Sequence, residues 1–441
     1  MSAPLQKIQC SQKLPASADV VVIGAGVVGA FAAYYLAQRG VSVALVEKGR
    51  VGAEQSSRNW GWCRQQNRDE RELPLATASL DLWDRFGQES GEETGFRRCG
   101  LFYLSNDEAE LARWSAWRDF ARGQGVTTHM LSADEASARG SATGKRWKGG
   151  VFSPSDGTAD PSRAVPAVAR AIMRVGGSVH EMCAARGLEF EGGRVSGVVT
   201  EAGTIRTRTV VMAGGAWASS FCRQYGIRFP QASVRASILS VTAPGETLPD
   251  ALHTADVSIT KRGDGSYTLA ISGKARVDPT LQQLRFSREF IPMFAKRWAS
   301  LAPGDLTGWR AGHETLATWQ LDRPTPMEAN RILDPVPDRK QIDETYRRAC
   351  QLFPAFRQTT MAAHWAGYID STPDGIPVIG EVAGRPGFIL AAGFSGHGFG
   401  IGPGAGHLIA DLVTGRTPLV DPSYYSFDRF SGGRAGRVSD F

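Results

Sequence analysis

The sequence predicts an α/β fold, α+β overall, and three neighbouring features support this prediction. The run DVVVI at 19–23 is rich in β-branched residues and is typical of a parallel strand buried on both faces. Spaced glycines and an apolar helical stretch follow, and a second apolar run comes at 43–46. A strand, a glycine turn, a helix and a second strand within about 30 residues form a βαβ unit.

The glycines of this unit fit the needs of a dinucleotide site. Gly24 permits a tight turn, Gly26 lets the backbone approach a pyrophosphate, and Gly29 lets the helix lie close to the strand. Val28 follows in the first helical turn, where unpaired N–H groups favour negative charge. Glu47 ends the second strand and can accept both ribose hydroxyls, while it would repel a 2′-phosphate. The motif therefore favours FAD or NAD over NADP.

Composition excludes several classes of function. The net charge of +6 is spread along the chain without interleaved aromatic residues, so we expect no nucleic-acid binding. Six scattered cysteines without a CxxC pair predict reduced thiols and no metal site. Reduced thiols are typical of a cytosolic-type compartment, so we expect a cytoplasmic location. No run of about 20 apolar residues occurs, so we expect no transmembrane segment. Peripheral membrane attachment and the oligomeric state stay open.

The remaining elements alternate between helices and strands. From apolar periodicity and capping residues we expect helices at 73–83, 107–124, 163–176 and 403–412. We expect strands at 100–104, 178–185, 188–190, 195–199, 209–217 and 376–380, and within 388–400, which runs into a glycine loop. At 441 residues the chain is long enough for two domains.

Four elements resemble the glycine/D-amino-acid oxidase (DAO) family of FAD-dependent oxidoreductases, which includes sarcosine oxidase, glycine oxidase and amino-acid dehydrogenases and deaminases. They are the glycine turn with Glu47, the pair SSRN at 56–59 and RELPLA at 71–76, AGGAW at 213–217, and TPDG at 372–375 with the loop at 393–399. In this order they cover nearly the whole chain.

The resemblance implies a Rossmann-like FAD-binding domain interleaved with a mixed-sheet substrate domain, with the flavin ring between them. We assign the FAD-binding domain to 18–105, 156–225 and 363–416, the substrate domain to 106–155 and 226–362, and a C-terminal tail to 417–441.

The resemblance also implies which residues bind FAD. Glu47 would hold the adenosine ribose, the backbone of Ala185 would pair with adenine, and the loop before 403–412 would turn its amides toward flavin N1 and O2. The full set expected to contact the cofactor is Gly24, Gly26, Val28, Gly29, Glu47, Lys48, Ser56, Ser57, Arg58, Asn59, Trp60, Ala185, Ala213, Gly214, Trp217, Gly367, Gly396, His397, Gly398 and Phe399.

Departures from the family bear on linkage and substrate. Ala366 stands where some members carry a flavin-linking cysteine, so we expect non-covalent FAD. Asn67 and Gly400 replace an arginine and a lysine that bind the substrate carboxylate in sarcosine oxidase-like members. Arg310 is our candidate replacement, with a structural arginine as the alternative.

Three further residues are catalytic candidates by resemblance. Arg64 would lie against the flavin ring, or be a solvated residue of a basic stretch. Lys274 would assist oxygen reduction, or be a surface lysine. Asp370 would recognise a cationic amine, or cap a turn.

The resemblance implies oxidation of a C–N bond in an amino acid or small amine. A hydride would pass to flavin N5, the imine would hydrolyse, and O2 or a quinone-type carrier would take the electrons. The alternative is a flavin-dependent 2-hydroxyacid or alcohol dehydrogenase of the same fold. A non-catalytic flavoprotein subunit is a third reading.

Overall fold

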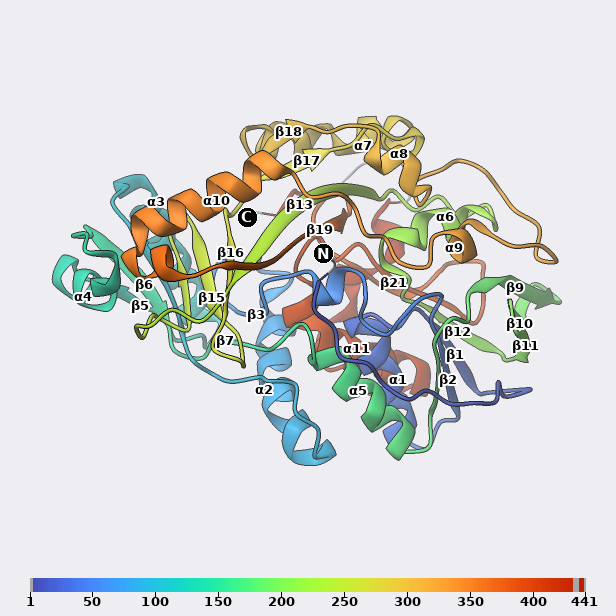
Figure 1. Ribbon diagram of the computed structural model, residues 1–441. Coiled ribbons are helices and arrows are strands. Elements are labelled where there is room, and N and C mark those ends of the chain that lie inside the picture. Colours follow the sequence, from blue (N-terminus) through green and yellow to red (C-terminus); the bar gives the residue numbers. More distant parts are fainter. Residues whose placement is uncertain (1–2, 431–435, 440–441) are drawn as a thin grey trace.

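The β-branched run at the start of the chain forms the middle of a six-stranded sheet in the computed structural model, which describes residues 3–430 and 436–439 (Figure 1). The strand order is β20-β21-β12-β1-β2-β8, and only the edge strand β20 runs antiparallel to its neighbour. The bounds are β1 Val20–Ile23, β2 Val43–Val46, β8 Ser178–His180, β12 Thr209–Met212, β20 Val378–Glu381 and β21 Phe388–Ala392.

Both faces of this sheet are covered, which explains why its strands are continuously apolar. Val20 and Val22 face the helices, whereas Val21 and Ile23 face a three-stranded antiparallel sheet. The helical layer consists of α1 Val27–Gln38, α2 Leu73–Ser90, α5 Ala164–Arg174 and α11 Gly398–Thr414. The three-stranded sheet consists of β9 Ala185–Glu191, β10 Arg194–Thr200 and β11 Gly203–Arg206.

Helices α1 and α11 pack with their backbones in close contact. A Cβ at Gly406 would overlap Phe31, and a Cβ at Gly402 would overlap Val27. The small residues of α11 therefore let it lie against α1, although the two helices come from opposite ends of the chain.

The second sheet is mixed and ten-stranded. Its order is β18-β17-β13-β16-β15-β14-β4-β6-β5, and β19 also pairs with β13. Helix α10 (Arg339–Leu352) covers one face, where Ile342 and Leu352 pack against Leu239 and Leu269 (Figure 1). The strands are β4 Leu101–Ser105, β5 His129–Leu131, β6 Gly149–Ser153, β13 Ala232–Val241, β14 Ala251–His253, β15 Ser258–Lys261, β16 Tyr267–Ala270, β17 Ala275–Val277, β18 Leu301–Pro303 and β19 Met361–Ser371.

Shorter elements connect the two sheets. A two-stranded ribbon pairs β3 Trp62–Cys63 with β7 Gly157–Thr158. The other α-helices are α3 Glu108–Gly123, α4 Ala133–Arg139, α6 Ala218–Arg223, α7 Leu281–Arg297, α8 Thr307–Ala311 and α9 Pro326–Ala329. The 3-10 turns are η1 Gln55–Ser57, η2 Ser141–Thr143, η3 Gly215–Trp217, η4 Trp298–Ser300, η5 Pro354–Gln358, η6 Pro422–Tyr425 and η7 Phe427–Phe430.

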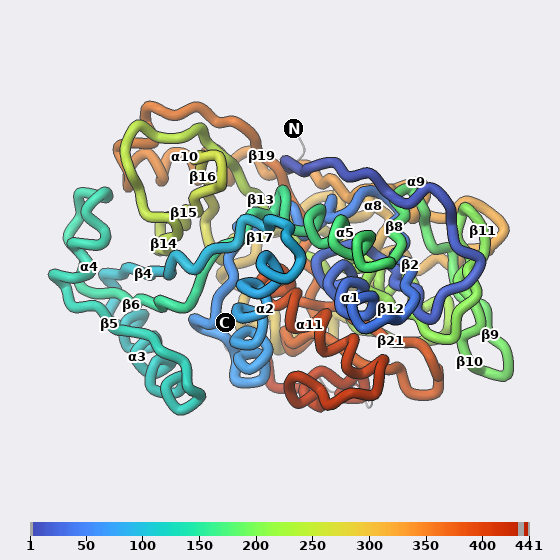
Figure 2. Tube along the Cα trace, turned by 90° about the horizontal axis from the view of Figure 1, so that it is seen from below, coloured from blue at the N-terminus to red at the C-terminus, as the bar shows by residue number. Residues whose placement is uncertain are grey.

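The N-terminal segment runs along the surface on the side of the six-stranded sheet (Figure 2). It passes α5 and β8 and reaches β11, because Gln6 N donates to Ser162 O, Ser11 N to Val179 O and Ala18 N to Arg206 O. Among residues 3–430 and 436–439, no helix combines the length and the apolar character needed to cross a membrane.

Three expectations about the elements need correction. Helix α11 begins at Gly398 rather than at Pro403, so the glycine loop already contains its first turn. The expected strand 178–185 ends at His180, because Met182 adopts a left-handed φ of 51°, and Ala185 instead opens β9. Strands β4 and β19, which we had placed in the FAD-binding segments 18–105 and 363–416, belong to the mixed sheet.

Candidate functional site

A cavity of about 940 Å³ lies between the two sheets. Ile23, Val46, Met212 and Ala391, at or next to the last residue of parallel strands, line one side. Parts of β13, β19 and α7 line the other. The carboxyl ends of parallel strands are the usual place for ligands in such sheets.

The three glycines of the first turn differ in what requires them. Gly24 has a φ of 101°, and a Cβ there would come within 2.6 Å of Ala213 O. A Cβ on Gly29 would overlap Gly24 O. Gly26 has an ordinary φ of −72°, and its Cβ would meet no protein atom closer than Ser56 Oγ at 3.4 Å. The fold thus requires Gly24 and Gly29, whereas Gly26 keeps open a space at the cavity wall that suits a diphosphate.

The N-terminus of α1 supplies hydrogen-bond donors to this space. The amide of Ala25 donates to Glu47 Oε2 at 2.8 Å, and that of Val27 donates to Ser56 Oγ at 2.9 Å. Within the described residues, the amides of Gly26 and Val28 have no acceptor. Two free N–H groups at a positive helix end favour an anion.

Glu47 lies where the sequence predicts it, at the cavity wall beyond β2. Oε1 accepts from the amide of Gly49 at 2.8 Å, and burial raises the pKa of the carboxyl above its usual range. Each carboxylate oxygen can accept a second hydrogen bond, so the group retains capacity for ribose hydroxyls.

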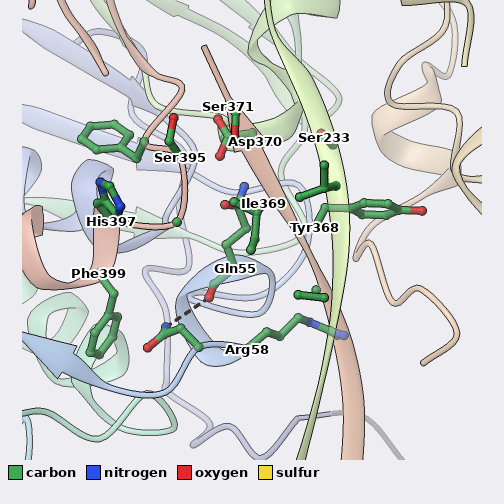
Figure 3. Close-up of a pocket in the computed structure, with 18 of the residues that line it drawn as sticks. Gln55, Arg58, Ser233, Tyr368, Ile369, Asp370, Ser371, Ser395, His397 and Phe399 are labelled. Atoms are coloured by element: carbon green, nitrogen blue, oxygen red, sulfur yellow. Dashed lines mark hydrogen bonds between the residues drawn. The ribbon is translucent and has the colours of Figure 1, made fainter. Parts of the chain in front are cut away.

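Two residues of the expected phosphate and ribityl path, Lys48 and Arg58, contact protein atoms. Lys48 donates to the carbonyls of Asn330 and Arg331 at 3.0 and 2.9 Å, so protein atoms hold its ammonium. Arg58 donates to Asp334 Oδ1 at 2.6 Å and to Ala366 O at 2.8 Å, and points toward β13 and β19 (Figure 3).

Most of the predicted cofactor residues line the cavity, but Ser57 and Gly29 do not. Ser57 instead donates its hydroxyl to Glu54 O at 3.3 Å. The predicted cofactor residues that line the cavity are Gly24, Gly26, Val28, Glu47, Lys48, Ser56, Arg58, Asn59, Trp60, Ala185, Ala213, Gly214, Trp217, Gly367, Gly396, His397, Gly398 and Phe399.

The N-terminus of α11 faces the same cavity. His397 is its N-cap, and among the described residues the amides of Gly398, Phe399 and Gly400 have no acceptor. His397 Nδ1 lies 2.9 Å from Glu72 Oε2, and burial lowers the pKa of the imidazole to about 4. Figure 3 shows His397 and Phe399 on one side of the cavity. Two positive helix ends therefore open onto one space.

Asp370 lies on β19 at the cavity wall and is buried (Figure 3). Its Oδ2 accepts from Gln231 Nε2 at 2.7 Å and from the amide of Gly393 at 2.9 Å. Burial raises the pKa of this carboxyl. These contacts give Asp370 a role in holding the start of the glycine loop against β19.

The other three catalytic candidates occupy different environments. Arg64 lines the cavity and donates to Gln66 O. Lys274 is exposed at the cavity rim, in the turn between β16 and β17. Arg310 is exposed on α8 and is not among the lining residues, so the structure does not bring it to the cavity. Its helix packs through Gly308 against Asp278.

Sequence reasoning missed one end of the cavity, where Arg68, Tyr103 and His253 join Trp62 and Arg64. Trp62 lies in β3, the two arginines in the loop after it, Tyr103 in β4 and His253 in β14. We call this set the β4 end. The short spacing between the two arginines was the only signal in the sequence, since strand order brings Tyr103 and His253 together.

Comparison with known proteins agrees with this geometry. The family model described as DAO, FAD dependent oxidoreductase, matches residues 19–412. Glycine oxidase from Pseudomonas aeruginosa is 26% identical over 428 residues, which cover 93% of this chain and 98% of that protein.

Two solved structures are also similar over nearly their whole length. L-amino acid deaminase from Proteus myxofaciens, in complex with anthranilate, has a TM-score of 0.92 and 29% identity and covers 97% of both chains. The deaminase from Proteus vulgaris has a TM-score of 0.91 and 28% identity, covering 96% of this chain and 100% of that chain. The family match spans most of the sequence, and the chain belongs to the DAO family of FAD-dependent oxidoreductases.

Proposed function

We propose that this oxidoreductase oxidises the C–N bond of an amino acid and binds its FAD non-covalently. The observation that carries the proposal is that the N-termini of α1 and α11 open onto one cavity, with Arg64 in its wall. The named activities of the relatives, on glycine and on L-amino acids, support this substrate class. The absence of a cysteine from the cavity wall, among the described residues, supports the non-covalent linkage.

Bound FAD would supply the redox chemistry by accepting a hydride from the substrate carbon. The substrate would lose that hydride from carbon and a proton from nitrogen, and water would hydrolyse the resulting imine to an oxo acid and ammonia. The free amides at the start of α11 offer hydrogen bonds and a positive helix end to negative charge. His397 is neutral at ordinary pH because burial lowers its pKa to about 4, so we assign it a positioning role.

The electron acceptor is O2 or a quinone-type carrier in this proposal. Lys274 is exposed at the cavity rim, and an exposed ammonium is well solvated. We therefore expect it to contribute little to oxygen reduction, and a peroxide assay distinguishes the two acceptors.

The test is anaerobic reduction of the flavin in the purified protein. We expect one or more L- or D-amino acids to bleach the flavin's visible absorbance and to yield ammonia when acceptor is added. Bleaching by 2-hydroxyacids but by no amino compound would replace the proposal with C–O oxidation. A protein that carries FAD but is bleached by neither class would contradict an enzymatic reading of this cavity.

A further inference from the structure

The loop after β3 places two guanidinium groups at the β4 end of the cavity. Asn67 adopts a left-handed φ of 57°, a conformation that asparagine tolerates, and Arg68 N donates to Gln65 O at 3.0 Å. The resulting turn folds Arg68 back, so that its Nε lies 3.4 Å from Arg64 O. Both side chains line the cavity.

Arg68 is a buried cation with an unused donor. The residue is 3% exposed, and its Nη1 has no hydrogen-bond partner. Burial and the neighbouring charge of Arg64 lower the pKa of Arg68 to about 10. A buried donor without an acceptor costs free energy, and two adjacent guanidinium groups repel each other.

The carboxylates that face this pair have other partners. Glu72 Oε2 is engaged by His397, and Asp156 accepts the amides of Gln65 and Gln66 at 2.7 and 3.2 Å. Within the part of the chain that the structure describes, no carboxylate oxygen lies within 4.0 Å of a nitrogen of Arg64 or Arg68. The charges of Glu72 and Asp156 partly balance that of Arg68, while Arg68 Nη1 has no hydrogen-bond partner.

Aromatic rings line the β4 end of the cavity together with the two arginines. The ring of Tyr103 lies 6.0 Å from that of Trp62 and 4.9 Å from that of His253, measured between centroids. Burial and the charge of Arg64 lower the pKa of His253 to about 4, so its ring is neutral. The walls therefore suit an uncharged group next to an anion.

We propose that Arg64 and Arg68 together bind the carboxylate of the substrate, and that Trp62, Tyr103 and His253 contact an uncharged substrate side chain. The inference rests on the proposed function, because it takes the β4 end as the place where the substrate binds. The pair of Arg64 and Arg68 thus has the carboxylate-binding role that the sequence suggested for Arg310. Arginine suits this role because its planar donors match a carboxylate.

The first experiment measures binding of a simple aromatic carboxylate without turnover. Benzoate is titrated into the FAD-loaded protein by calorimetry, with benzyl alcohol as the uncharged match. We expect benzoate alone to bind, and Arg68→Met and Arg64→Met each to weaken it at least about tenfold. Arg310→Met, on the exposed surface of α8, serves as the matched control and should leave benzoate affinity unchanged.

Two outcomes would overturn the inference. One is a benzoate affinity of Arg68→Met within about twofold of the parent protein while its flavin absorbance is intact. The other is no benzoate binding to the parent at all. If Arg68→Met does not fold, Arg68→Lys is the second variant, because lysine keeps the charge but lacks the planar guanidinium. We expect the Arg68→Lys protein to bind benzoate more weakly than the parent and to bind FAD normally.

A second experiment separates this inference from the proposed function. Flavin reduction by phenylalanine is compared with reduction by phenethylamine, which lacks the carboxylate. We expect the amino acid to be strongly preferred, and the preference to fall at least about tenfold in Arg68→Met. Reduction by both with equal kcat/KM would contradict the arginine site and leave C–N oxidation intact. Arginine-dependent benzoate binding without reduction by any amino compound would contradict the proposed function alone.

Discussion

His397 Nδ1 and Glu72 Oε2 lie 2.9 Å apart, and this contact joins the N-cap of α11 to the N-cap of α2. Glu72 is fully buried, and His397 is largely so. The glycine loop at the cavity is therefore held by a helix that begins far earlier in the chain. We infer that this pair sets where the N-terminus of α11 points.

Replacing Glu72 tests the contribution of this contact. Glu72→Leu removes the carboxylate that His397 Nδ1 contacts, so we expect the free energy of unfolding to fall by about 2 kcal/mol. Glu72→Gln keeps a hydrogen-bonding group and should cost less. Urea unfolding of both variants measures the difference, and equal stability of the leucine and glutamine variants would contradict the role of the pair.

The glycines of the first turn give a prediction that separates folding from cofactor binding. Gly26→Val should fold but retain no FAD, because its side chain has room against the protein and projects into the space for the diphosphate. Gly29→Ala should fail to fold, because its Cβ would overlap Gly24 O. Circular dichroism and flavin absorbance read the two properties separately. If the Gly26→Val protein still carries flavin and is yellow, the diphosphate does not bind at this turn.

His313 provides a prediction about pH. Its side chain is fully buried, both ring nitrogens lack hydrogen-bond partners, and burial with the charge of Lys48 lowers its pKa to about 3. In the unfolded chain His313 binds a proton near the ordinary pKa of 6.5, whereas in the folded protein it stays neutral down to about pH 3. The free energy of unfolding therefore has its full value above pH 6.5 and falls as the pH is lowered toward 3. At pH 5 the loss is about 2 kcal/mol.

His313→Phe should therefore stabilise the protein, and more at pH 5 than at pH 7.5. A phenyl ring fits between the rings of Trp217 and Tyr368, whose centroids lie 6.1 and 4.5 Å from that of His313. Urea titrations at the two pH values measure the effect. A gain that does not depend on pH would show that His313 titrates normally in the fold.

Lys274→Met should leave the rate of flavin reoxidation by oxygen within about twofold, because an exposed ammonium contributes little electrostatic stabilisation. Stopped-flow reoxidation of the reduced protein measures this rate. A drop of a hundredfold would restore Lys274 as the group that assists oxygen reduction.

Local patterns in the sequence were enough to predict the βαβ unit at the centre of the six-stranded sheet. The β-branched run before Gly24 and the acidic residue Glu47 predicted β1, α1 and β2, because burial on both faces and a tight turn leave clear signatures. The expected strands 188–190 and 195–199 likewise lie within β9 and β10.

Contacts between distant residues were not predictable in the same way. The start of α11 at Gly398 depends on close packing against α1, which glycine spacing alone does not indicate. Arg310 carries no local signal that α8 turns it to solvent. Arg68 could be recognised only after the fold showed it buried beside Arg64 with an unused donor.

The most direct test of this account is a crystal structure of the FAD-loaded protein. We expect the diphosphate within hydrogen-bonding distance of the amides of Gly26 and Val28. We also expect the pyrimidine edge of the flavin at the amides that begin α11, Gly398 to Gly400. A cofactor that engages only one of the two helix N-termini, or that lies outside the cavity between the two sheets, would contradict the account.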